Sequence, residues 1–100
     1  MENICTQLKE ATLTVSLAGR IDINNVDYIE EVIVRDLKSY VRELVFDFEK
    51  VECIFSCGLR LLLNLKKMAH EECQIRIINT NDMVKEIFKV TGYLSILKVE

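Results

Sequence analysis

The chain has 100 residues, 50% of them hydrophobic, and a formal net charge of −3 from 13 basic and 16 acidic side chains. This length and hydrophobic content fit one domain over residues 1–100 and argue against two. The slight acidic excess leaves no basic stripe that could neutralise phosphates, so direct nucleic-acid binding is not expected.

The cysteines, the single histidine and the hydropathy limit the chemistry further. No 18 apolar residues run together, and the chain does not start like a signal peptide, so we expect a cytoplasmic protein without membrane insertion. With one histidine and no cysteine pair at two-residue spacing, we expect no metal site, cofactor or catalytic residue. The cysteines expected to be reduced and mostly packed in the core are Cys5, Cys53, Cys57 and Cys73.

The first twenty residues predict two strands joined in a hairpin, because apolar residues alternate with polar ones. The side chains expected on the inner faces of the two strands are Ile4, Thr6 and Leu8, then Leu13, Val15 and Leu17. We expect the turn at Lys9-Glu10, although it lacks the Asn-Gly or Asp-Gly pair that favours tight hairpins.

After Gly19 the apolar period changes to about 3.6 residues, which predicts a helix of roughly fourteen residues capped by Asn24 or Asn25. A strand over residues 44–48 and a loop through Val51 and Ile54 follow. A second helix begins near Ser56, and its leucine-rich sequence predicts the most buried helix.

The remaining sequence predicts a strand over residues 73–77, a third helix and a last strand over residues 96–99. Asn81 or Asp82 is expected to cap the third helix, and Gly92 to take a left-handed conformation just past its end. The chain therefore reads as an α/β protein, with an N-terminal hairpin and then alternating helices and strands forming a mostly parallel sheet.

In an open α/β sheet the strand-to-helix loops meet at the carboxyl edge of the strands, where such folds bind ligands. The loops expected there cover residues 19–25, 49–56 and 79–82. They bring Asp22, Ser56, Asn81 and Asp82 toward one rim.

Two segments carry a resemblance to a known family. Residues 51–63, VECIFSCGLRLLL, resemble the signature of the anti-sigma-factor antagonists of the STAS type, in which a strand and short loop lead to Asp-Ser-(Ser/Thr/Ala)-Gly-Leu and an apolar helix. Residues 19–22, GRID, are similar to the family's Gly-x-Leu/Ile-Asp turn. The match departs at Phe55, where the family usually has an acidic residue. The resemblance covers almost the whole chain and implies a small single-domain STAS-like fold.

By that resemblance, Ser56 corresponds to the serine that an anti-sigma factor phosphorylates as an ATP-dependent kinase. The unphosphorylated antagonist binds the anti-sigma factor and frees a sigma factor, the phosphorylated form dissociates, and a phosphatase resets it. Catalysis belongs to the partners, so this chain is not expected to be an enzyme. The residues expected to bind the partner are Asp22, Ile54, Phe55, Ser56, Cys57, Gly58 and Arg60.

A phosphate on Ser56 would lie at the start of its helix, where the macrodipole and free N–H groups favour negative charge. Phosphorylation is therefore expected to leave the helix intact. It would add about two negative charges to a docking surface, and so disrupt the complex by repulsion and desolvation if acidic groups stand opposite.

Two other functions stay open. Phe55 favours a STAS interaction module that is not phosphorylated, such as a subunit of a transporter or signalling complex. A small enzyme that uses Cys57 or binds a nucleotide at the rim would need a pocket, and His70, more than three turns further along the predicted helix, cannot pair with Cys57. The simplest interpretations are structural: Ser56 as an N-cap and Asp22 as a turn residue.

Overall fold

Strands that are neighbours in the sheet are also consecutive in the sequence. The computed structural model describes residues 3–100. Its elements are β1 (Ile4–Lys9), β2 (Thr12–Ile21), α1 (Val26–Asp36), β3 (Glu43–Ile54), α2 (Ser56–Met68), β4 (Gln74–Ile78), α3 (Asp82–Val90), the 3₁₀ turn η1 (Tyr93–Ser95) and β5 (Lys98–Val99). The sheet order is β1-β2-β3-β4-β5, with β1 antiparallel to β2 and the other pairs parallel. The predicted α/β class, hairpin and parallel sheet are confirmed.

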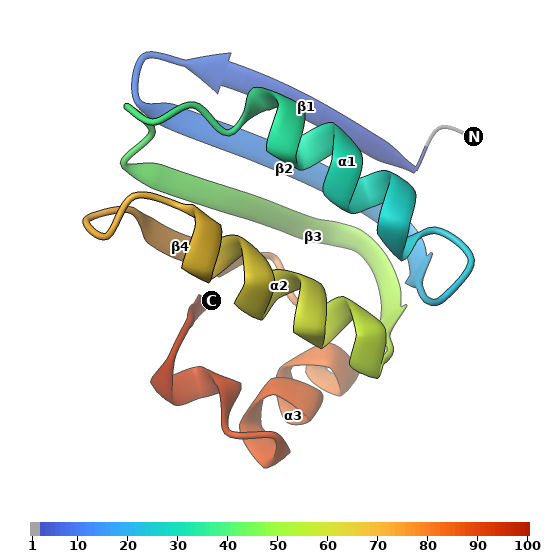
Figure 1. Ribbon diagram of the computed structural model, residues 1–100. Coiled ribbons are helices and arrows are strands. Elements are labelled where there is room, and N and C mark those ends of the chain that lie inside the picture. Colours follow the sequence, from blue (N-terminus) through green and yellow to red (C-terminus); the bar gives the residue numbers. More distant parts are fainter. Residues whose placement is uncertain (1–2) are drawn as a thin grey trace.

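The helices lie on one face of the sheet. Each parallel crossover moves one strand further in the same direction, and right-handed crossovers that all advance in one direction place their helices on the same side. Figure 1 shows α1 and α2 side by side over this face, with α3 beyond α2. We call this side the covered face and the other side the open face.

The covered face carries the hydrophobic core. Its buried cross-strand rows are Leu13, Leu44 and Ile75, then Val15, Phe46 and Ile77. The ring of Phe48 lies 6.2 Å from that of Phe46 and 6.3 Å from that of Phe88 on α3, measured between centroids. The predicted alternation of the strands is therefore confirmed, and the aromatic cluster fixes α3 to the sheet.

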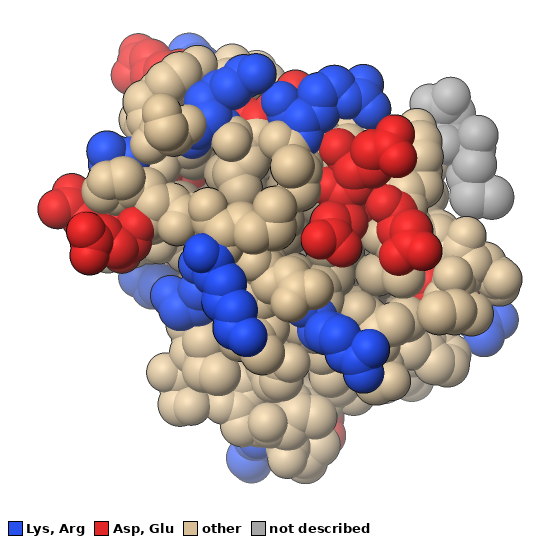
Figure 2. Space-filling model, in the orientation of Figure 1, with Lys and Arg blue, Asp and Glu red and all other residues tan. Residues whose placement is uncertain are grey.

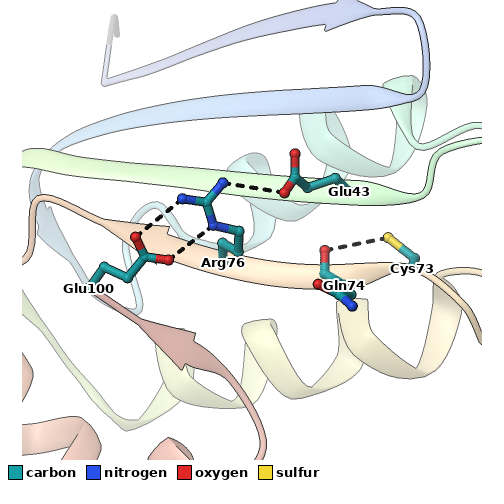
Figure 3. Close-up of polar contacts among 5 residues, drawn as sticks. All are labelled: Glu43, Cys73, Gln74, Arg76 and Glu100. Carbon is teal, nitrogen blue, oxygen red and sulfur yellow. Dashed lines mark hydrogen bonds and ion pairs between the residues drawn. The ribbon is translucent and has the colours of Figure 1, made fainter.

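The open face carries polar and charged side chains from the intervening positions. Thr14, Val45 and Arg76 are cross-strand neighbours there, and Val45 is a buried apolar residue between the two polar ones. Arg76 donates to Glu43 at 3.3 Å, and to the two carboxylate oxygens of Glu100 at 3.0 and 3.2 Å. Figure 3 shows the Arg76 guanidinium between these two carboxylates, with the helices behind the sheet. This side of the sheet is tied together by charge rather than by apolar packing.

Several element boundaries differ from prediction. Helix α1 has 11 residues rather than fourteen. Strand β5 has two residues because the N–H groups of Ile96 and Leu97, which were predicted in the strand, donate to the carbonyl oxygen of Tyr93 in the turn that follows η1. Strand β3 continues to Ile54 where a loop was predicted, because it stays paired with the end of β2 through two register shifts. The hairpin turn lies at Glu10-Ala11, one residue later than expected, with Glu10 in the left-handed region at φ 56°.

The cysteines are free, but they are not uniformly in the core. Cys73 is buried, and burial raises the pKa of its thiol. Its sulfur lies 3.8 Å from the carbonyl oxygen of Gln74 (Figure 3). Cys5 is exposed, which contradicts its prediction as a core residue, because it pairs with Ser16 and so shares the open face.

Within residues 3–100, no helix combines the length and the apolar character that crossing a membrane requires.

Candidate partner-binding site

Three adjacent segments at the carboxyl edge of the sheet are tied together by hydrogen bonds. The backbone N–H of Phe55 donates to the carbonyl oxygen of Ile21 at 3.0 Å, which joins the end of β2 to the start of α2. The side-chain amide of Asn81 donates to the carbonyl oxygen of Val51 at 3.0 Å, which joins the start of α3 to β3. The predicted convergence of the three segments is therefore correct. Figure 1 shows the β2–α1 loop and the start of α2 at the same end of the sheet.

The side chains of the β2–α1 loop stabilise the loop itself. Asp22 accepts a hydrogen bond from the backbone N–H of Asn24 at 3.0 Å, which is the turn interpretation of that residue. Asn25 occupies the N-cap position of α1 but makes no capping bond there. Its side chain instead accepts from the backbone of Asp22 and donates to the carbonyl oxygen of Arg20.

Helix α2 begins at Ser56, as predicted, but the N-cap is Phe55. Ser56 is therefore the first helical residue, and its side chain is exposed. A phenylalanine side chain has no acceptor, and within residues 3–100 the backbone N–H groups of Ser56 and Cys57 have no hydrogen-bond acceptor. The start of α2 thus presents a hydroxyl and two free donors to solvent.

The ring of Phe55 lies against a cation. The guanidinium carbon of Arg20 is 5.4 Å from the ring centroid, within the range of a cation–π contact. Phe55 remains 41% exposed and Arg20 is exposed as well. Arg20 was not among the predicted site residues. The pairing of Ile21 with Ile54 brings the end of β2 beside the start of α2, and this pairing is visible only in the structure.

Gly58 and Ile54 are structural. A Cβ at Gly58 would lie 2.7 Å from Cγ1 of Ile54 and 2.8 Å from Cγ2 of Ile21, so only glycine permits α2 to approach the strands this closely. Ile54 is 2% exposed and belongs to the core. The prediction that Ile54 offers its side chain to a partner is therefore wrong.

Cys57 and Arg60 line a shallow hollow of about 150 Å³ between α1 and α2. Asp27 and Glu30 of α1 form part of the opposite wall. Figure 2 shows this division, with acidic side chains gathered over the start of α1 and separate basic side chains over α2. The hollow is smaller than the roughly 300 Å³ at which pockets for small molecules begin, so the rim presents a surface rather than a cleft.

The remaining predicted residues have local roles. Asn81 caps α3 by accepting from the backbone N–H of Val84 at 2.7 Å, as predicted, and Asp82 is the first residue of that helix. His70 lies beyond the end of α2, not on it, and accepts from the backbone N–H of Glu72. Within residues 3–100, no three His, Cys, Asp or Glu side chains are grouped to hold a metal ion.

Known proteins share both the sequence pattern and the fold. The STAS domain family matches residues 3–100. The putative anti-sigma factor antagonist BtrV of Bordetella bronchiseptica is 26% identical over 91 residues, which cover 90% of this chain and 78% of BtrV.

Solved structures agree on the fold. The crystal structure of an anti-sigma factor antagonist from Mycobacterium paratuberculosis superposes with a TM-score of 0.86 at 20% identity, covering 96% of this chain and 82% of that one. The phosphorylated form of the Bacillus cell fate determinant SpoIIAA superposes with a TM-score of 0.73 at 17% identity, covering 97% and 90%. The family match over nearly the whole chain, together with this fold, shows that the protein belongs to the STAS domain family.

Proposed function

We propose that this protein is an anti-sigma factor antagonist whose binding to an anti-sigma factor is switched by phosphorylation of Ser56. The anti-sigma factor acts as the ATP-dependent kinase, the unphosphorylated antagonist holds it and so frees a sigma factor, and a phosphatase resets the switch. This circuit operates in the cytoplasm. The names of the BtrV relative and of the solved neighbours support the antagonist role.

The observation that carries the proposal is the position of Ser56. Its hydroxyl is exposed on the first residue of α2, where the N–H groups of Ser56 and Cys57 lack acceptors. A phosphate there would meet the positive end of the helix dipole and free donors, so the helix would tolerate it. The added charge, about two units, would act on the docking surface rather than on the fold.

The site favours binding over catalysis. The hollow beside Cys57 is about 150 Å³, and its other polar wall residues are two carboxylates, Arg60 and Asn64 rather than a histidine that could serve as a base. We therefore assign the chemistry of the switch to the partner kinase and phosphatase.

Intact-mass spectrometry tests the switch. The protein is incubated with Mg²⁺-ATP and each purified anti-sigma factor of the same organism. We expect a gain of one phosphate, about 80 Da, that is lost in Ser56→Ala and kept in the control Ser39→Ala, which alters another exposed serine. A stable complex without any phosphate on Ser56 would instead favour a constitutive STAS interaction module, the function that Phe55 suggests.

A further inference from the structure

Three exposed apolar side chains belong to the segments that meet at the carboxyl edge, where Ser56 also lies. Ile23 of the β2–α1 loop is 76% exposed, Phe55 is 41% exposed, and Met83 in the first turn of α3 is 60% exposed. We call these three residues the apolar rim. They come from the three segments that hydrogen bonds tie together at the carboxyl edge, and Ile23 lines the same hollow as Cys57. Large exposed apolar side chains on segments that meet at one edge make that edge a candidate binding surface.

Phe55 is also a poor choice for the local structure. Ser, Thr, Asp and Asn are favoured at an N-cap because their side chains accept from the first free N–H groups of the helix. Phe55 leaves those groups of α2 without an acceptor, and it stays 41% exposed beside the Arg20 guanidinium. A residue that breaks a local rule and remains this exposed is typical of a functional surface.

The charges beside the rim are positive on the α2 side. Arg20 lies over the Phe55 ring, and Arg60 follows one turn into α2, which has no acidic residue in its first turn. Both arginines are exposed, and neither is in an ion pair within residues 3–100. Asp27 and Glu30 line the same hollow as Arg60 but form no ion pair with it within residues 3–100, so both guanidinium groups can still meet acidic groups on a partner.

We propose that the apolar rim, flanked by Arg20 and Arg60, docks a surface of the anti-sigma factor that has an apolar centre and an acidic edge. This inference rests on the proposed function and specifies the contact that the switch controls. It also explains release. A phosphate on Ser56 would be desolvated where it meets the apolar groups of the interface, and it would repel the acidic groups of the partner. It would also attract Arg20 and Arg60 away from those acidic groups.

The rim is tested by substituting its central residue. We expect Phe55→Asp and Phe55→Ala to weaken binding to the purified anti-sigma factor at least tenfold by isothermal titration calorimetry, because exposed aromatic anchors dominate such interfaces. Phe55→Asp should at the same time raise the urea midpoint, since aspartate can cap α2. A loss of affinity in a more stable protein cannot come from misfolding.

Tyr40→Asp is the matched control. It also replaces an exposed aromatic residue by an acid, but at the opposite edge of the sheet, before β3 begins. The affinity of Tyr40→Asp for the anti-sigma factor should equal that of the wild type.

The outcomes separate the two proposals. If Phe55→Asp binds within about twofold of the wild type while Ser56 is still phosphorylated, the rim is wrong and the switch stands. If Phe55→Asp loses binding but Ser56 of the wild type is never phosphorylated, the rim stands and the switch is wrong. If light scattering shows a wild-type dimer that Phe55→Asp dissociates, the rim binds a second copy of the chain, and the proposed partner is wrong.

Discussion

The covered and open faces of the sheet carry residues from the same strands, yet their side chains make different contacts. On the covered face Phe46 and its neighbours are buried beneath helices, whereas on the open face Arg76 joins Glu43 and Glu100 in contact with water. Buried apolar area dominates folding free energy, while exposed ion pairs contribute little. Most of the folding free energy therefore comes from the covered face. The alternation of the strands decides whether a side chain contributes through apolar burial or through exposed polar contacts.

The largest expected effect is on the free energy of unfolding, when two neighbouring residues on opposite faces of β3 are each replaced by alanine. Phe46→Ala should lower the free energy of unfolding by about 3–5 kcal/mol, because it empties the aromatic cluster under the helices. Val45→Ala, one residue away on the open face, should cost about 1–2 kcal/mol for the loss of two methyl groups. Urea unfolding of both variants measures the difference. Equal losses of unfolding free energy would mean that the open face contributes as much to stability as the covered face.

The next effect concerns the closest approach of a helix to the covered face. Gly58→Ala gains about 1 kcal/mol of helix propensity but forces its methyl group against Ile21 and Ile54, and overpacking typically costs about 1–3 kcal/mol. We expect a net loss of about 1 kcal/mol by urea unfolding. Repeating the substitution in an Ile54→Ala background should reduce that loss, because one of the two clashing groups is removed. An unchanged loss in that background would mean that the cost arises elsewhere.

The smallest effect belongs to the open face and depends on pH. The Arg76 guanidinium holds the pKa of Glu100 below its usual value through hydrogen bonds and charge, and Glu100 in turn raises the pKa of Arg76, which stays cationic. A carboxyl whose pKa is lowered on folding stabilises the fold above its unfolded pKa, and this contribution is lost as the pH falls through the folded value. Stability from this pair should therefore be present at neutral pH and disappear in acid.

Carboxyl carbon NMR titrations of the wild type and Arg76→Gln measure this coupling directly. The titration midpoint of Glu100 should rise in Arg76→Gln, because the guanidinium that lowers its pKa is removed. An unmoved Glu100 would mean that the open-face contacts do not persist in solution.

Periodicity alone predicted most of the fold. The alternation in β2 and the 3.6-residue spacing in α1 report which face is buried, and burial is what the structure confirms at Leu13, Phe46 and Ile29. The length of β3 was missed because the residues around Lys50 follow no simple alternation, and their pairing with β2 depends on register shifts that only a neighbouring strand reveals. Cys5 was misplaced because it was assigned by residue type, although the alternation of Ile4, Thr6 and Leu8 already puts it on the other face of the strand.

The candidate site was predicted by position but not by contact. Ser56, Asn81 and the loop of Asp22 are at the edge where the order of elements placed them. The stacking of Arg20 on Phe55 could not be read from the sequence, because it joins the end of β2 to the N-cap of α2, and these positions have no periodic relation. Ile54 was wrongly placed at the surface because closeness to Ser56 in the sequence says nothing about the direction in which a side chain points.

The strand order has one further consequence for what this domain can bind. Doubly wound sheets reverse their strand order at a topological switch point, where loops diverge and open a crevice for a cofactor. Here the order β1-β2-β3-β4-β5 runs in one direction, so the loops at the carboxyl edge stay packed beside one another. The described residues therefore form a continuous rim at this edge, without the crevice of a switch point. A rim of this shape suits contact with the surface of another protein.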